Sequence, residues 1–197
     1  MQKLTFLLKT VAAMAFAAFA LIACSTTTST TTAPGKAEAS SARTEIDAGV
    51  DSTLNRMYTQ VSGSRELVTK ADGVLVFPRV LAAGLGVGGE YGKGALRAKG
   101  KHAGYYSLAS VSVGFQAGAQ SKAIVVLFMT KEALDKFRAS QGWSIGADAS
   151  VAVVKLGANG AIDSTTITSP VQVIVMTNAG LMANLTLEGT KISPVAM

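Results

Sequence analysis

Apolar side chains around residue 50 recur at the spacing of a helix. Neighbouring apolar positions are three or four residues apart, so they lie along one face of an α-helix and the polar residues lie on the other. Thr44, followed by an acid in the first turn, is placed to cap this helix, and Gly63 ends it. The apolar positions are Ile46, Val50, Leu54, Tyr58 and Val61. The pattern predicts an amphipathic helix from Thr44 to Val61.

After Gly73 the apolar residues form short runs that are typical of strands, with glycine, lysine or serine at the breaks. Thr130 then precedes "KEALDKFRAS", in which Leu134 and Phe137 have the spacing of a helix face. Asn159-Gly160 marks a later turn, and there is no regular strand-helix-strand alternation. We therefore expect an α+β fold with a mainly antiparallel sheet, an N-terminal amphipathic helix and one helix inserted near 131–140.

The segment "GLGVGGEYGKG" contains Gly84, Gly86 and Gly89 at the spacing of a dinucleotide-binding loop. Such a loop opens a helix, and an acid about 20 residues later binds the ribose. Here the following residues have no helical stripe, and the stretch from Tyr91 through Lys131 contains no acid. The sequence therefore argues against a nucleotide cofactor.

Small residues occupy alternate positions in three of the expected strands, so they share one face of each strand. A face without large side chains permits close approach, as in a barrel-like or strongly bent sheet or a sheet that covers an apolar helix. A pocket lined for a ligand is the alternative. The positions are Gly84, Gly86 and Gly88; Gly114, Gln116, Gly118 and Gln120; and Gly146, Asp148, Ser150 and Ala152.

The N-terminus has the pattern of an exported lipoprotein. The apolar run from Val11 to Ala23 is shorter than the roughly 20 residues that span a bilayer, and it follows two lysines, as in a signal peptide. It ends in "LIAC", which resembles the bacterial lipobox, and lipidation would account for the single cysteine, Cys24. A secreted protein with a leftover cysteine is the alternative.

These features predict three parts and a location. The parts are a lipoprotein signal peptide (1–23), a flexible Ser/Thr-rich linker (24–43) and a folded domain (44–197). Ser25, which follows the cysteine, favours sorting to the outer membrane by analogy with other lipoproteins. We therefore expect a protein of the bacterial cell envelope, lipid-anchored at the outer membrane and facing the periplasm or the surface.

Cationic side chains gather between residues 93 and 102, in a chain of formal net charge +6. Even separations place Lys93, Arg97 and Lys99 on one strand face, with Lys101 in the turn beyond. Tyrosines at positions 91, 105 and 106 flank the cluster with rings suited to a membrane interface. This basic hairpin predicts contact with anionic lipid, and a solvated surface is the alternative. Nucleic acid is not expected as a partner outside the cytoplasm.

Catalytic and metal-binding residues do not form a familiar pattern. His102 is the single histidine, and no G-x-S-x-G motif occurs. Glu90 and Asp148 are carboxylates within small-residue strand sequence, and they could act as acid and base only if the fold brought them together. We therefore predict no enzymatic activity, no cofactor and no metal.

An ordered series of motifs spans about Ile46 to Ile192. The motifs are "GVLVFP", "GLGVGGEYGKG", "GYYSLASVSVGFQAGAQS", "VLFMT", "ALDKF", "GADASVAV" and "LMANLTLEGTKI". In this order they resemble the SYLF domain, the lipid-binding module also called the actin-regulating, Las-seventeen-binding type. The resemblance implies lipid binding through an amphipathic helix and a basic surface. The corresponding residues are Ile46, Val50, Leu54 and Tyr58 for membrane contact, and Lys93, Arg97, Lys99 and Lys101 for the lipid headgroup.

Eukaryotic members of that family bind phosphoinositides, and some bind actin, but an exported chain is not expected to meet actin. Two functions follow from the sequence. The first is a membrane-anchored lipoprotein whose domain binds phospholipid, with a preference for anionic headgroups. The alternative is a structural or partner-binding envelope lipoprotein with no lipid ligand. A third hypothesis is a carrier that holds an apolar molecule inside the curved sheet.

Overall fold

The computed structural model describes residues 36–148, 151–154, 169–177, 180–181, 187 and 189–197, and within strands it does not describe the side chains of 85–87, 112–119 and 180–181. Residues Lys36–Met197 form one compact unit. The expected signal peptide, Cys24, Ser25, Ser150 and the Asn159-Gly160 turn lie outside the described residues.

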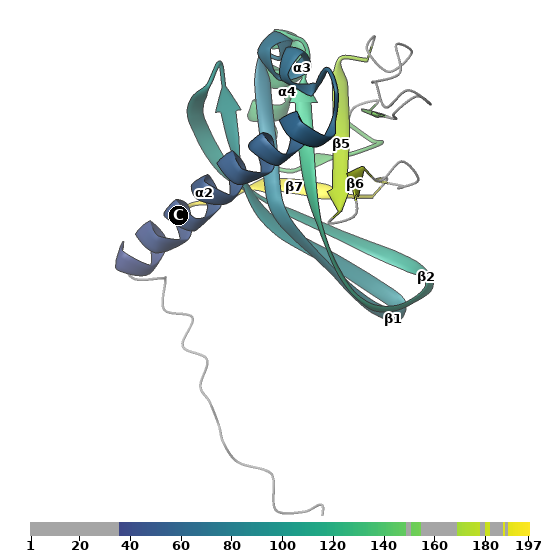
Figure 1. The fold of residues 1–197 in the computed structure, drawn as a ribbon. Coiled ribbons are helices and arrows are strands. Elements are labelled where there is room, and N and C mark those ends of the chain that lie inside the picture. Colours follow the sequence, from purple (N-terminus) through teal and green to yellow (C-terminus); the bar gives the residue numbers. More distant parts are fainter. Residues whose placement is uncertain (1–35, 149–150, 155–168, 178–179, 182–186, 188) are drawn as a thin grey trace, which may run out of the picture. The chain divides into compact units, whose positions relative to one another are not determined.

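The described part of the chain contains three helices and seven strands (Figure 1). The helices are α2 (Lys36–Gln60), α3 (Ser64–Lys70) and α4 (Lys131–Ala139). The strands are β1 (Gly73–Ala98), β2 (Lys101–Phe128), β3 (Trp143–Ser144), β4 (Val151–Val153), β5 (Val171–Thr177), β6 (Gly180–Leu181) and β7 (Lys191–Pro194). The strands form one sheet in the order β3-β7-β2-β5-β4, with β1 on β2 and β6 on β5. All pairs are antiparallel except β4 with β5, so the predicted α+β class is confirmed.

Helix α2 begins eight residues before the predicted start. Residues 36–43, which the sequence analysis assigned to the linker, are helical. Thr44 lies inside the helix, where its hydroxyl donates a hydrogen bond to the carbonyl oxygen of Ser40 (3.1 Å), so it is not the N-cap. The early residues include alanine, lysine and glutamate, which favour helix without an apolar stripe. The apolar periodicity therefore marked only the part of α2 that packs on the sheet.

Strands β1 and β2 form one long hairpin, whereas the glycine breaks had predicted several short strands. Their pairing runs from Gly73↔Phe128 to Ala98↔Lys101. Figure 1 shows both strands running together to a sharp bend and returning. A register shift between Gly84 and Gly86 falls in the glycine-rich segment, where the backbone bends most easily. The prediction of a strongly bent sheet is confirmed.

Two glycines beyond the bend let the ends of β1 approach each other. A Cβ atom on Gly94 would overlap the carbonyl oxygen of Val76, and one on Gly92 would lie 2.9 Å from the carbonyl oxygen of Arg79. After Gly89 the chain continues as a strand, without the helix that a dinucleotide loop requires. The glycines of this region therefore serve the packing of backbone on backbone.

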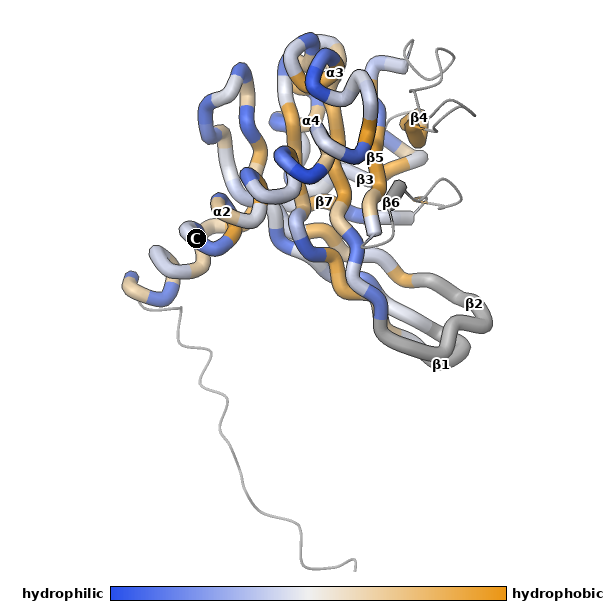
Figure 2. Tube along the Cα trace, in the orientation of Figure 1, coloured by the Kyte–Doolittle hydropathy of each residue, from blue (hydrophilic) through white to orange (hydrophobic). Residues whose placement is uncertain are grey.

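The sheet separates two apolar cores. Successive side chains of a strand point to opposite faces, so Leu75 and Phe77 enter one core while Val74 and Val76 enter the other. Residues of α4 complete the first core, and residues of α2 and α3 complete the second. Figure 2 shows the apolar segments concentrated in the strands that both cores share.

Helix α4 forms as its sequence predicts. The Thr130 hydroxyl accepts a hydrogen bond from the backbone N–H of Ala133 (3.2 Å), which caps the helix, and Leu134 is buried. The ring of Phe137 lies 4.7 Å from that of Phe128 and 5.4 Å from that of Trp143, measured between centroids. These aromatic contacts fix α4 on the face of the sheet opposite α2.

Candidate lipid-headgroup site

The apolar face of α2 packs on the sheet. Ile46, Val50 and Leu54 are buried in the core with Met57, and Tyr58 is half-buried beneath the guanidinium of Arg65, which lies 4.2 Å from its ring centroid. The side chains assigned to membrane contact are therefore core side chains in this structure. A membrane contact through them requires α2 to leave the sheet. Among the described residues, no helix is long and apolar enough to span a bilayer.

The hairpin turn carries exposed cations. Lys99 (φ 47°) and Gly100 (φ 77°) both have positive φ, as a two-residue type I′ turn requires. Lys99 thus occupies the turn and Lys101 is the first residue of β2, the reverse of the sequence prediction. Lys93, Lys99 and Lys101 are exposed, and no ion pair joins them to the described residues.

Arg97, the fourth predicted headgroup residue, is held by α2. Its guanidinium lies 2.5 Å from a carboxylate oxygen of Asp51, and its side chain is 24% exposed. The hydrogen bond from Arg97 lowers the pKa of Asp51, and the same bond raises the pKa of Arg97. One predicted headgroup contact is therefore already neutralised within the protein.

Asp47 makes a second polar connection between α2 and the hairpin. It accepts a hydrogen bond from the hydroxyl of Tyr105 (2.8 Å), and the His102 Nδ1 atom lies 4.0 Å from its other carboxylate oxygen. Burial, with the hydrogen bond to Asp47, raises the pKa of Tyr105. The acids that compensate the basic hairpin come from α2, earlier in the chain than the hairpin itself.

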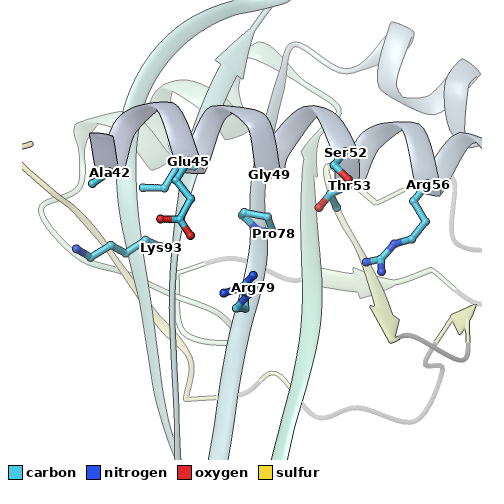
Figure 3. Close-up of a pocket in the computed structure, with 10 residues that line it drawn as sticks. Ala42, Glu45, Gly49, Ser52, Thr53, Arg56, Pro78, Arg79 and Lys93 are labelled. Atoms are coloured by element: carbon cyan, nitrogen blue, oxygen red, sulfur yellow. The ribbon is translucent and has the colours of Figure 1, made fainter. Parts of the chain in front are cut away.

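A cavity of about 430 Å³ lies between the other edge of α2 and β1 (Figure 3). In the close-up, Arg56 reaches down from α2, and Arg79 lies on β1 below Pro78, on the side of the strand that faces α2. The cavity is lined by Ala42, Glu45, Ile46, Gly49, Ser52, Thr53, Arg56, Pro78, Arg79 and Lys93. Three cations and one carboxylate thus surround a volume in the usual range of small-ligand pockets.

The cations of this cavity are not paired within the described part of the chain. No salt bridge joins Arg56, Arg79 or Lys93 to a described acid, and the Nε–H of Arg56 is buried without an acceptor. A buried donor with no partner costs about 1–3 kcal/mol. The cavity therefore offers a positively charged surface with an unused hydrogen-bond donor.

Close packing of α2 on β1 shapes this cavity. A Cβ atom on Gly49 would lie 2.9 Å from both Cβ and Cγ of Pro78, so only glycine permits the approach. A register shift between Phe77 and Val80 lies beside this contact, and both Pro78 and Arg79 line the cavity. The register shift in β1 thus contributes Arg79 to the lining of the cavity.

A second cavity, of about 500 Å³, lies at the opposite edge of α2 beside α3 and the hairpin turn. Its lining includes Leu54, Tyr58, Val68 and Val74, with the cations Lys70, Arg97 and Lys99. Lys70 pairs with Glu66 (2.7 Å) and Arg97 pairs with Asp51. Because two of its three cations are neutralised, this cavity offers less net charge to an anion.

The two candidate acid-base carboxylates have separate partners. Glu90 accepts a hydrogen bond from Lys122 Nζ (2.7 Å), in a pair whose side chains are 14% and 6% exposed. Asp148 accepts from the backbone N–H of Ser144 (2.6 Å). The structure does not bring the two carboxylates together, and each has a structural contact instead.

Residues 109–196 match the family model named Ysc84, described as a Las17-binding protein actin regulator. This segment is similar to the SYLF family. The resemblance predicted from the motifs is confirmed over this range, which runs from within β2 to two residues beyond β7. The SYLF family is a family of binding domains associated with lipid and with actin. No curated protein matches the chain.

The cavity beside β1 lies in the part of the chain that precedes the matched SYLF segment. The sequence analysis named neither Arg56 nor Arg79 as a site residue. Two signals were available in the sequence: an arginine directly after Pro78, where a strand is interrupted, and the glycine at position 49 of an otherwise regular helix. Neither signal indicates that helix and strand meet there.

Proposed function

We propose that this domain binds membranes rich in anionic phospholipid. The observation that carries the proposal is the set of exposed lysines Lys93, Lys99 and Lys101, which form no ion pair with the described residues. Lys93 is also two residues from the exposed Tyr91 on the same strand. Similarity of the matched segment to a lipid-associated family supports it. A lysine close to an anionic bilayer contributes about 1 kcal/mol to binding.

The exposed apolar residues flank the glycine bend of the β1–β2 hairpin. Leu81, Tyr91 and Val111 are 56%, 52% and 76% exposed. Tyr91 is opposite Ala109, and Val111 is opposite Gly89, so Tyr91 and Val111 project from the same face of the ribbon as Lys93. A surface that combines lysine with exposed apolar side chains suits the boundary between headgroups and acyl chains.

The hairpin turn provides the test of this proposal. A chain that begins at Ser25 contains the whole described domain and lacks the acyl anchor, so its binding to liposomes measures the domain alone. Replacing both turn lysines (Lys99→Gln with Lys101→Gln) should weaken binding to phosphatidylglycerol vesicles by about thirtyfold, which corresponds to roughly 2 kcal/mol. Binding should also fall as salt is raised.

The matched control removes two lysines from α4 (Lys131→Gln with Lys136→Gln), which changes the net charge by the same amount. Its binding should stay close to that of the parent. Equal binding of the parent to phosphatidylglycerol and phosphatidylcholine vesicles would contradict the proposal and favour the alternative of an envelope protein without a lipid ligand.

The anchoring part of the proposal rests on the N-terminal sequence. Acylation of Cys24 in the envelope would hold the domain at the membrane, and several acyl chains make such attachment effectively permanent. A Cys24→Ser variant should therefore lose the mass of the lipid and stay unprocessed, as seen by mass spectrometry of the membrane fraction. The same mature mass in both proteins would contradict this anchor.

A further inference from the structure

We propose that the cavity between α2 and β1 binds the phosphate group of a phospholipid headgroup, with Arg56 and Arg79 as its ligands. This deepens the proposed function, because it assigns to that function a built site apart from the hairpin turn. The cavity is the place in the described structure where unpaired cations from a helix and a strand face the same volume (Figure 3).

The donor set fits a phosphate. A guanidinium is a planar fork that hydrogen-bonds two phosphate oxygens at once, and two arginines can bind one phosphate from opposite sides. Arg56 approaches from α2 and has a buried Nε–H without an acceptor, while Arg79 approaches from β1. The side chains of Ser52 and Thr53 also line the cavity and supply hydroxyl donors.

The charge balance also favours an anion. Three cations line the cavity, and Glu45 is the single carboxylate among the lining residues. No ion pair within 4.0 Å joins Glu45 to a described cation. The surroundings therefore keep a net positive charge, which a phosphodiester would neutralise in part.

The location favours a lipid as the source of the phosphate. Lys93 lines the cavity and is two residues from Tyr91, so the two side chains lie on the same face of β1. Tyr91 belongs to the exposed apolar set that we propose touches the membrane. A headgroup can therefore enter the cavity while its acyl chains stay with the bilayer.

The test uses the chain that begins at Ser25 and short-chain dihexanoyl phosphatidylglycerol, below the concentration at which it forms micelles. Titration followed by calorimetry and by the NMR signals of the arginine Nε–H groups should show binding in which the Arg56 signal moves. Arg56→Gln and Arg79→Gln should each weaken this binding about tenfold or more, because each removes a charged hydrogen bond to phosphate.

The matched control is Arg138→Gln, an exposed arginine on α4 whose loss changes the net charge equally and should leave binding unchanged. Thermal unfolding of each variant checks that the fold is kept, and Arg79, which is exposed, provides a variant whose loss leaves the core intact. Unchanged lipid binding in both folded variants would overturn the proposal.

Further arms separate the sources of phosphate and the two proposals. Inorganic phosphate and glycerol 3-phosphate should bind more weakly than the short-chain lipid, and equal affinity for inorganic phosphate would overturn the assignment to a headgroup.

If parent and Arg56→Gln bind phosphatidylglycerol vesicles equally and only the turn variants lose binding, the cavity is not the site and the membrane proposal stands. If the short-chain lipid binds at Arg56 but no vesicle binds the parent, the cavity assignment stands and the membrane proposal fails.

Discussion

The two long edges of α2 meet the sheet in different ways. At one edge, Asp47 and Asp51 contact Tyr105 and Arg97 of the hairpin through hydrogen bonds of 2.8 and 2.5 Å. At the other edge, Arg56 faces a cavity in which the nearby cations have no described acid as a partner. Both edges have cations from the sheet and an acid from the helix, but among the described residues only the first edge pairs a helix acid with a sheet cation.

This difference teaches which charges are structural and which are free for a ligand. The sequence shows a basic hairpin as a uniform cluster, whereas the fold divides it into Arg97, which is neutralised, and the exposed lysines. The cation with the clearest unmet hydrogen bond, Arg56, is outside that cluster altogether. A count of cations along the sequence therefore overestimates the unpaired charge near Arg97, and it misses Arg56 and Arg79 at the opposite edge of α2.

The largest expected effect is on the free energy of unfolding, and it comes from removing a side chain from the core that holds α2 on the sheet. Met57 belongs to α2 and is fully buried in the core between this helix and the sheet, so Met57→Ala should destabilise the domain by about 2–5 kcal/mol. Urea denaturation followed by circular dichroism measures this loss, with the exposed Gln60→Ala as a control. If membrane binding uses the apolar face of α2 after detachment, the variant should also gain vesicle binding that resists salt. A loss of stability below about 1 kcal/mol would mean that α2 is not held by this core.

A smaller change in stability, of opposite sign, is expected at the edge of α2 that faces the arginine cavity. Arg56→Met removes the unpaired donor and keeps much of the side-chain volume, so it should leave stability unchanged or raise it by about 1 kcal/mol in phosphate-free buffer. The midpoint of thermal unfolding measures the change. A clear destabilisation would show that Arg56 has a structural role, and the contrast between the two edges would disappear.

The smallest effect is expected at the paired edge. Asp51→Asn removes the ion pair with Arg97, but the Asp51 side chain is 59% exposed, so the loss should stay below about 1 kcal/mol. The hydrogen bond from Arg97 lowers the pKa of Asp51 from its ordinary 3.8. A lowered folded-state pKa means that the stabilisation is complete above about pH 3.8 and is lost as pH falls through the folded value.

The difference in unfolding free energy between parent and Asp51→Asn should therefore be constant from pH 7 to 5, begin to fall near pH 3.8 and disappear once the pH is below the lowered folded-state pKa of Asp51. Denaturation curves at several pH values measure it. A difference that grows on acidification would have the wrong sign for this ion pair.

Elements with a local cause were predictable from the sequence. The spacing of Ile46, Val50 and Leu54 identified the face of α2 that packs on the sheet, and Thr130 identified the start of α4. The glycine-rich segments indicated a bent sheet because a backbone without side chains can approach another closely. In each case the residues that decide the structure are neighbours in the chain.

The candidate site was not predictable for the opposite reason. Arg56 and Arg79 belong to different elements, and they line one cavity only because Gly49 packs on Pro78. The pairing of Asp51 with Arg97 likewise joins residues 46 positions apart. Sequence periodicity reports which face of an element is apolar, but it does not report which elements meet or at what register.

The folded hairpin also fixes an order of events during folding. The Lys99-Gly100 turn joins Ala98 to Lys101, which are three residues apart, whereas Gly73 and Phe128 are 55 residues apart. Closing a short loop costs less entropy than closing a long one, so we expect pairing to spread from the turn toward the strand ends. The core under α2 includes both Ala95 and Val76, from opposite sides of the bend. We therefore expect helix docking, and with it the arginine cavity, to come after pairing has passed the bend, so the hairpin lysines should be in place before the cavity is complete.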